Sequence, residues 1–336
     1  MQRTAHRSAG LFAAAALLFL SACSGSNPDT TKANNAPARV LDPGDSPHFD
    51  DKFWSHWGDG KAELAGYELT YPRYGQLRSG VAVTVFVTET FSNTARVKAD
   101  PGKHPGSDQF PVMKLNLITD FQTGIYDYNT MLSGFVALAP VNDRPAGNAT
   151  KTSFSSQEWC GHAYTQLLFD AQSIRLASHS YFDGEADEQR EFDYPKDGMS
   201  EDVLPFWARG LAQPVLIPGE TRKVQLLLSL QSSRESHQPL TWRRATLRRA
   251  RSAQSLTVPA GTFEVESWSA ELEDGLSKKF YVEKAAPHRI IRWETSTGEQ
   301  AGLLGVDRLE YWKMNGRGGE EALKALGLSP RPPRST

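Results

Sequence analysis

Apolar and polar residues alternate along most of this chain, and turn residues separate the alternating runs. Val81–Phe91 is the clearest run, because β-branched and aromatic side chains dominate it. A period of two is typical of strands that bury one face. The runs predicted as strands are Gly66–Tyr71, Val81–Phe91, Val112–Thr119, Gly124–Thr130, Thr152–Trp159, His162–Phe169, Ile174–Phe182, Lys223–Leu230, Trp242–Ala250, Ser255–Val258, Thr262–Leu272, Lys278–Lys284, His288–Thr295 and Leu303–Trp312.

Helical patterns are few and short. Asp50–His56, Glu201–Leu211 and Glu320–Leu326 are predicted helices, with Pro205 tolerated only in a first turn, and the acidic segment Asp183–Asp193 is predicted to be a loop. About a dozen strands without helical crossovers cannot form a parallel sheet. The predicted fold is therefore mainly β: a large antiparallel sheet, strongly curved or closed as a half-barrel or barrel, with a few short helices.

The first residues have the pattern of a secretory signal. Arg3 and Arg7 precede the apolar run Leu11–Leu20, which is shorter than the roughly 20 residues that span a bilayer. The run ends in Leu20-Ser21-Ala22-Cys23, which resembles the lipobox of bacterial lipoproteins. In such proteins the Cys thiol is first alkylated by a diacylglycerol, so the resemblance implies cleavage on the N-terminal side of Cys23 and anchoring by fatty acyl chains such as palmitate. The alternative is an ordinary secretory signal with a Cys there by chance.

The predicted organisation has four parts. Residues 1–22 form the signal peptide, 23–47 a flexible tether rich in Ser, Asn, Pro and Asp, 48–328 one β-rich domain and 329–336 a disordered tail. A division of the domain into two halves near 184–221 is left open. No Asp directly follows Cys23, so the lipoprotein resemblance implies the outer membrane of a diderm bacterium and its periplasmic face.

Composition removes several classes of function. The net charge of −2 argues against a nucleic-acid partner, and two Cys cannot form a disulfide scaffold or a multi-Cys zinc site. The sequence contains no G-x-S-x-G, P-loop or G-x-G-x-x-G motif, and its His residues lack metal-ligand spacing. We therefore expect no cofactor and no bound metal, and we do not expect an enzyme.

Two resemblances point to bacterial envelope proteins. Ser255–Val258, Pro259-Ala260-Gly261-Thr262-Phe263, Lys278–Val282 and Pro287–Trp293 resemble the envelope family DUF3108. A family of bacterial lipoproteins of unassigned role is similar to this chain at Phe53-Trp54, Trp57–Leu64, Gly66-Tyr67, Pro72–Gly75, Pro111–Asn116, Asp120–Tyr128 and Ser155–His162. Some members carry the label septum formation inhibitor Maf, but this chain lacks the phosphate-handling motif of that cytoplasmic pyrophosphatase. The resemblance implies a shared fold and no particular chemistry.

Glu158-Trp159-Cys160-Gly161-His162 is the densest cluster of reactive side chains. In an extended segment, Glu158, Cys160 and His162 would share one face of a strand. Three interpretations stay open: a buried Cys with a hydrogen-bonded His, the lining of a ligand site, or a thiolate–imidazole pair in an enzyme. The residues proposed to line a ligand site, in a cavity rich in aromatic side chains, are Glu158, Trp159, Cys160, His162, Tyr126 and Tyr128.

Five Arg within nine residues form the other notable cluster. Arg243, Arg244, Arg248, Arg249 and Arg251 indicate either a solvated hairpin rim or a patch for anionic lipid or polysaccharide. Taken together, the patterns favour a membrane-anchored, non-enzymatic envelope factor. Its concave sheet would bind an apolar, lipid-like ligand or an envelope protein. A structural or assembly module without a cavity is the alternative, and a thiol-dependent enzyme using Cys160 and His162 comes third.

Overall fold

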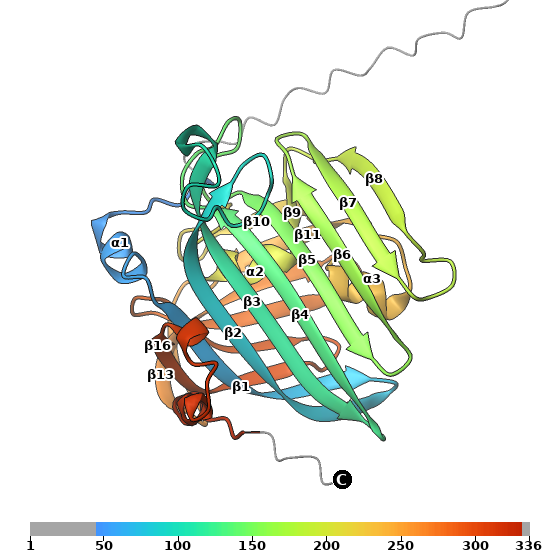
Figure 1. Cartoon of the computed structure of the whole chain (residues 1–336). Helices are drawn as coiled ribbons and strands as arrows, with labels where there is room; N and C mark the ends of the chain where they lie inside the picture. The colour runs from blue at the N-terminus through green and yellow to red at the C-terminus, as the bar shows by residue number, and fades with distance from the viewer. Residues whose placement is uncertain (1–44, 331–336) are drawn as a thin grey trace, which may run out of the picture. The chain divides into compact units, whose positions relative to one another are not determined.

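The computed structural model describes residues 45–330 (Figure 1). The predicted signal peptide, Cys23, most of the predicted tether and residues 331–336 of the predicted tail lie outside the described residues. The strands are β1 Ala62–Arg73, β2 Gln76–Ser92, β3 Gln109–Thr123, β4 Tyr126–Ala137, β5 Ala149–Glu158, β6 Gly161–Phe169, β7 Ser173–Ser180, β8 Glu188–Asp193, β9 Gly198–Ser200, β10 Thr221–Leu227, β11 Trp242–Arg249, β12 Gln254–Val258, β13 Gly261–Leu272, β14 Ser277–Glu283, β15 Ile290–Thr295 and β16 Gln300–Leu309. The helices are α1 Asp51–Trp57, η2 Gly106–Asp108, η3 Glu201–Val203, α2 Leu204–Ala208, α3 Leu230–Ser236, η4 Tyr311–Lys313 and η5 Gly319–Leu326.

All sixteen described strands belong to one sheet. Its order is β8-β7-β6-β5-β4-β3-β2-β1-β16-β15-β14-β13-β11-β10-β9, with β12 paired to β13 beside this path. Every described pairing is antiparallel except β9 with β10, which are parallel. The predicted fold class is confirmed: a large, almost wholly antiparallel sheet with few short helices. Strands β8 and β9 lie at its two ends, so the described sheet does not close.

Tight turns set the register of successive strands. Arg73 pairs with Gln76, which leaves Tyr74 and Gly75 as a two-residue turn with φ values of 53° and 71°. Positive φ at both positions is the geometry that matches the twist of a hairpin. Glu158 pairs with Gly161 in the same way, so Trp159 and Cys160 form the turn between β5 and β6.

The short helix α2 packs against the interior face of the sheet. All residues of α2 are buried, and Figure 1 shows α2 and α3 behind the wall formed by β3–β6, with further strands behind them. The Phe206 ring lies 5.7 Å from Phe86 on β2, whereas Trp207 lies 5.0 Å from Trp268 on β13. α2 therefore packs against strands from both ends of the chain. The interior face is consequently a packed core along α2.

A buried ion pair holds the end of this segment. The Arg209 guanidinium donates to the Glu63 carboxylate on β1 at 2.7 Å, and both side chains are almost wholly excluded from solvent. The same guanidinium lies 4.3 Å from the centre of the Phe86 ring. Removing one partner of such a pair leaves a buried charge without compensation, which typically costs about 3–5 kcal/mol.

The exterior face of β1 and β16 is also apolar, and η5 covers it. Leu64, Val85 and Val87 form a cluster there with Leu326 of η5. Gly66 and Gly305 are paired across the two strands, and a Cβ at either position would lie within 2.5 Å of a backbone oxygen of η5. The two glycines therefore permit η5 to lie directly on the strands.

Three local predictions were wrong. The predicted loop Asp183–Asp193 contains strand β8, because Glu188–Asp193 pair with Ser173–Ser178. The predicted strand Lys223–Leu230 ends at Leu227, and Leu230 begins the helix α3. The predicted strand Leu303–Trp312 ends at Leu309, and Tyr311 begins the 3-10 helix η4. Asp45, the first described residue, accepts from Arg222 at 2.9 Å.

In the described part of the chain, no helix has both the length and the apolar character needed to cross a bilayer.

Candidate ligand groove beside α3

A groove of about 650 Å³ lies between α3 and the neighbouring strands. Its walls come from β1, α3, β10, the β13–β14 hairpin and the β15–β16 turn. Its apolar surface is supplied chiefly by leucine: Leu204, Leu226, Leu228, Leu272 and Leu276. Its polar rim is supplied mainly by hydroxyl and amide groups, including those of Ser229, Gln231, Ser232, Ser236, Gln238, Thr241 and Ser277. Six charged side chains also line the groove: Arg73, Glu201, Glu235, Arg243, Lys278 and Glu299. Apolar surface beside oriented polar groups is a combination that small-molecule sites share.

The position of α3 depends on capping at its first turn. The Ser229 hydroxyl accepts from the Ser232 N–H, as expected at an N-cap. The Glu201 carboxylate accepts from the Ser229 N–H at 3.0 Å, and the Asp202 carboxylate from the Leu230 N–H at 3.3 Å. Residues 201 and 202 precede α2, so the two helical segments are linked directly. The groove wall is thereby attached to the packed interior.

One polar cluster on α3 lines the groove. The Tyr71 hydroxyl of β1 donates to the Glu235 carboxylate, and the Gln231 amide donates to the same carboxylate at 3.1 Å. Burial raises the pKa of Glu235, and burial together with the nearby Glu235 raises the pKa of Tyr71. The groove therefore offers a carboxyl group that is easier to protonate than an exposed Glu.

A second cluster fastens the opposite side of α3 to the sheet. The Arg234 guanidinium donates to the Glu158 carboxylate of β5 at 2.8 Å, and the Tyr128 hydroxyl donates to the other oxygen of that carboxylate. Burial, reinforced by this hydrogen bond, raises the pKa of Tyr128 well above its ordinary value. Arg234 also lies 3.7 Å from the centre of the Phe182 ring. The Arg234–Glu158 pair therefore holds α3 against β5.

The structure separates the residues that the sequence proposed as ligand-lining. Glu158 and Tyr128 are brought together, but they are buried behind α3 and do not line the groove. Trp159, Cys160 and His162 are exposed at the β5–β6 hairpin, and Tyr126 stacks on Trp159 with ring centres 6.1 Å apart. The common face expected for Glu158, Cys160 and His162 does not exist, because the chain turns at Trp159 and Cys160.

The arginine cluster of β11 is largely neutralised. Arg249 donates to Glu266 at 2.7 Å, Arg243 pairs with Asp274, and Arg244 lies 4.0 Å from Glu273. Arg248 and Arg251 are exposed. Three of the five guanidinium groups therefore already face carboxylates on the neighbouring strand or turn.

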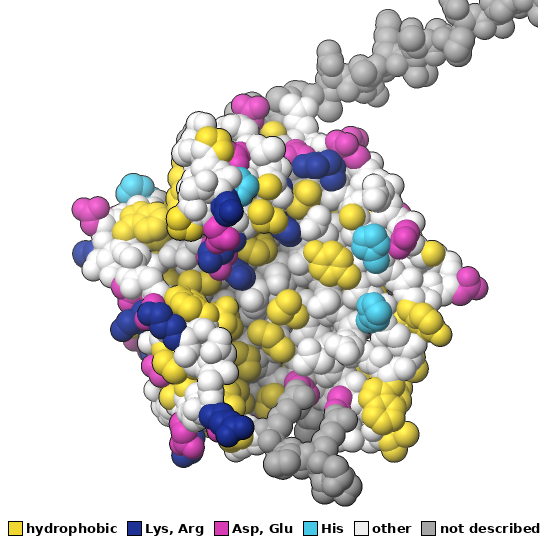
Figure 2. Space-filling model, viewed as in Figure 1, with side chains coloured by type: hydrophobic (Ala, Val, Ile, Leu, Met, Phe, Trp, Pro, Cys, Tyr) yellow, Lys and Arg dark blue, Asp and Glu magenta, His cyan; other side chains and the backbone are white. Residues whose placement is uncertain are grey.

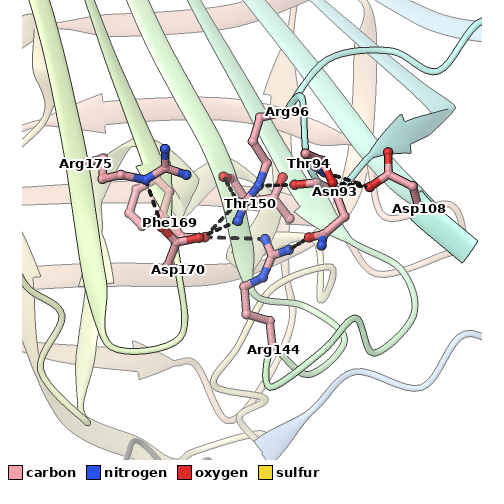
Figure 3. A network of polar contacts seen from close by, with 9 residues as sticks. All are labelled: Asn93, Thr94, Arg96, Asp108, Arg144, Thr150, Phe169, Asp170 and Arg175. Carbon is pink, nitrogen blue, oxygen red and sulfur yellow. Dashed lines mark hydrogen bonds and ion pairs between the residues drawn. The ribbon is translucent and has the colours of Figure 1, made fainter. Parts of the chain in front are cut away.

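Another charged network lies at the far end of β2–β7 (Figure 3). Arg96 and Arg144 are both buried and both donate to the Phe169 carbonyl, at 2.9 and 3.3 Å. Arg96 also pairs with Asp170, which receives Arg175 from β7 at 3.0 Å. Burial and the neighbouring Arg96 lower the pKa of Arg144 to about 10. These bonds tie the β2–β3 and β4–β5 loops to the β6–β7 turn.

Sequence patterns did not reveal the groove because they did not reveal α3. The segment Leu230-Gln231-Ser232-Ser233-Arg234-Glu235-Ser236 has three Ser and little apolar periodicity, so it follows a strand without a helical signal. Ser229 as an N-cap, with Gln231 and Glu235 four residues apart, was the available signal. Within residues 45–330, no group of three or more His, Cys, Asp or Glu side chains is placed to hold a metal ion.

The protein is thus defined by an open β-sheet, an interior helix and a lateral groove. No protein-family model matches the chain, and no curated protein matches it. A solved structure similar to it is the beta-barrel-like protein of domain of unknown function DUF1849 from Brucella abortus. That likeness has a TM-score of 0.42 and 9% sequence identity, over 75% of this chain and 99% of that chain.

Proposed function

We propose that this protein is a non-enzymatic lipoprotein of the periplasmic face of the outer membrane, and that it binds a lipid-like ligand in the groove beside α3. The groove is the observation that carries the binding role. Its leucine surface suits an acyl chain, while the hydroxyl and amide groups at its rim suit the polar end of an amphipathic molecule.

The site differs from the one expected from the sequence. A ligand on the whole concave face of the sheet would collide with α2, whose side chains are all buried. Binding in the groove needs no displacement of this core. The lipid anchor at Cys23 and the envelope location rest on the lipobox resemblance, which lies outside the described residues.

The rival interpretations have less support. A purely structural module would not need an apolar groove of this volume. An enzyme using Cys160 would need a base beside the thiol, but His162 is an exposed residue beyond the hairpin turn. The arrangement of described residues therefore favours binding over catalysis.

Native purification followed by mass spectrometry tests the proposal. Extraction of the lipidated protein in mild detergent is expected to recover a lipid-like molecule at close to one per chain. A dansyl-labelled fatty acid is expected to compete for the same site. Leu276→Glu places a charge in the groove wall and is expected to weaken probe binding at least tenfold.

Val97→Glu is the matched control, because Val97 and Leu276 have the same exposed fraction of 44% and only Leu276 lines the groove. Binding by Val97→Glu should equal that of the parent. A protein that carries no lipid and does not bind the probe, or a Leu276→Glu variant that binds as well as Val97→Glu, would refute the groove as the ligand site.

A further inference from the structure

Large apolar side chains are concentrated at one end of the sheet. Within residues 45–330, six such side chains are more than half exposed, and five of them lie at or next to successive hairpin turns. Tyr74 belongs to the β1–β2 turn, and Leu77 is the second residue of β2. Ile125 belongs to the β3–β4 turn, Trp159 belongs to the β5–β6 turn, and Tyr181 directly follows β7. Their exposed fractions run from 57% to 78%, so none of them contributes much to the core.

Sheet topology places these turns side by side. Strands β1–β8 pair in order and antiparallel, so every turn that follows an odd-numbered strand lies at the same end of the sheet. Figure 2 shows hydrophobic side chains at the lower right margin, where the ends of β5–β8 lie in Figure 1. We call Tyr74, Leu77, Ile125, Tyr126, Trp159 and Tyr181 the turn rim.

Contacts between neighbouring turns make the rim continuous. The Tyr74 hydroxyl lies 2.5 Å from that of Tyr128, next to Tyr126 on β4. Tyr126 in turn stacks on Trp159. Tyr181 packs over Gly161, where a Cβ would lie 2.4 Å from its ring. An aromatic row therefore crosses four hairpins.

The charge of the rim fits the surface of a lipid bilayer. The segments Tyr74–Leu77, Gly124-Ile125 and Trp159-Cys160 contain no Asp or Glu. Of the acidic residues next to them, Glu158 is buried and paired with Arg234, and Asp127, which follows Tyr126, is half-buried. Arg73 and Arg78 flank the first turn, and the Arg73 guanidinium stacks on the Tyr74 ring at 4.5 Å. Trp and Tyr favour the interface between water and acyl chains, and Arg pairs with lipid phosphate. Asp183, Glu185 and Asp187 lie in the connection between β7 and β8, beyond Tyr181, so the part of the surface without acidic residues ends there.

We propose that the turn rim docks on a lipid bilayer, with Leu77 and Ile125 entering the acyl region and the aromatic rings at the headgroup level. A protein partner is the less favoured occupant, because exposed Tyr and Trp rings beside Arg side chains match the preferences of the membrane interface. Arg73 also lines the groove beside α3, so docking would bring the mouth of the groove near the lipid. The docking proposal itself does not require a ligand in the groove.

The test uses the mature chain that the lipobox resemblance implies, residues 23–336 with Cys23→Ala, so that neither the apolar run Leu11–Leu20 nor an acyl chain can anchor it. The vesicles are of phosphatidylcholine with or without phosphatidylglycerol. Cys160 then provides a single thiol in the rim, which an environment-sensitive dye can label. The dye at Cys160 is expected to shift to shorter wavelength with vesicles and to be quenched by nitroxide lipids. A matched chain with Cys160→Ser and Asp143→Cys carries the dye on the β4–β5 loop, at the other end of β4 and β5, and should show neither change.

Rim substitutions supply the second measurement. The double variant Leu77→Asp and Ile125→Asp is expected to lower the vesicle-bound fraction at least tenfold. Ile217→Asp should leave it unchanged, because Ile217 lies outside the rim although its exposed fraction of 69% is between those of Leu77 (65%) and Ile125 (78%). Leu276→Glu should also leave vesicle binding unchanged, which separates this proposal from the ligand groove. Absence of vesicle binding, equal binding by the double variant, or quenching only at position 143 would overturn the proposal.

Discussion

Asp202 carries a carboxyl group into the interior, next to the first turn of α3. Only 2% of the residue is exposed. Burial, together with the adjacent Glu201, raises its pKa from 3.8 to about 7. Between these two pH values the folded protein keeps a proton that the unfolded chain releases. The contribution of Asp202 to stability is therefore greatest below about pH 4, falls as the pH rises to about 7, and is constant above it.

Asp202→Asn should remove this pH dependence, because an amide resembles the protonated carboxyl and its oxygen can still accept from the Leu230 N–H. We expect the free energy of unfolding at pH 8 to rise by about 1–3 kcal/mol relative to the parent, with little change at pH 4. Urea unfolding between pH 4 and pH 8 measures this difference. A variant that loses stability with pH as steeply as the parent would contradict the assignment.

Glu158 shows what residue-level reasoning from the sequence can and cannot provide. The sequence indicated Glu158 and Tyr128 as residues that line a ligand site, and the structure places them together in one buried hydrogen-bonded cluster instead. Their partner Arg234 is 76 residues away from Glu158 in the chain, so no local pattern could indicate it. The sequence also grouped Cys160 and His162 with Glu158, because alternation holds only while the strand continues.

At the scale of elements, α3 is a helix of seven residues that depends on tertiary contacts. Isolated helices of this length are unstable in water, since nucleation is costly. Its capping carboxylates and the Arg234–Glu158 pair hold it in place. The groove therefore has one wall whose stability is set by a few polar contacts.

Arg234→Met should destabilise α3, because the substitution leaves the Glu158 carboxylate buried without the cation that pairs with it. We expect a loss of about 3–5 kcal/mol in the free energy of unfolding and faster amide exchange across Leu230–Ser236. Arg190→Met, which removes an exposed pair with Glu188, should cost less than about 1 kcal/mol.

The double variant Arg234→Met and Glu158→Gln should recover part of the loss, since no unpaired charge then remains. Unchanged exchange in α3 for Arg234→Met would show that the helix does not depend on this pair.

The elements that could be predicted are those with local signals. The β1–β2 hairpin is an example, because apolar runs flank a turn that contains Gly75. The helix near Pro205 was also predictable, since a Pro fits the first turn and apolar residues follow it. Strand β8 was missed because all but one of its residues are exposed at a sheet edge, where charged side chains discourage pairing with other chains. Strand β9 has three residues and pairs with β10, which lies after α2, so nothing near it in sequence indicates it.

At the scale of the whole described domain, the sheet consists of two runs of neighbouring strands joined by one long-range pairing. Strands β1–β8 follow one another, and β9–β16 complete the other side. Only the pairing of β1 with β16 links the two runs within the sheet, and α2 packs against both. The stability of either run should therefore depend on the other.

A protease site inserted between Lys196 and Asp197 tests this dependence. After cleavage, the two pieces are expected to elute together in gel filtration, because the β1–β16 pairing and the contacts of α2 remain. Each piece purified in urea and refolded alone is expected to lack a cooperative unfolding transition, and mixing should restore one. Separation of the pieces without denaturant, or cooperative unfolding of one piece alone, would show two independent domains.

The pairing of Ala62 with Leu309 also determines when the sheet can be completed during biosynthesis. These partners are about 250 positions apart, so β1 has no neighbour on one side until nearly the whole chain has been made. Non-local pairings of this kind slow folding. A chain that leaves the ribosome in order will therefore keep one edge of β1 unpaired until its last strand emerges.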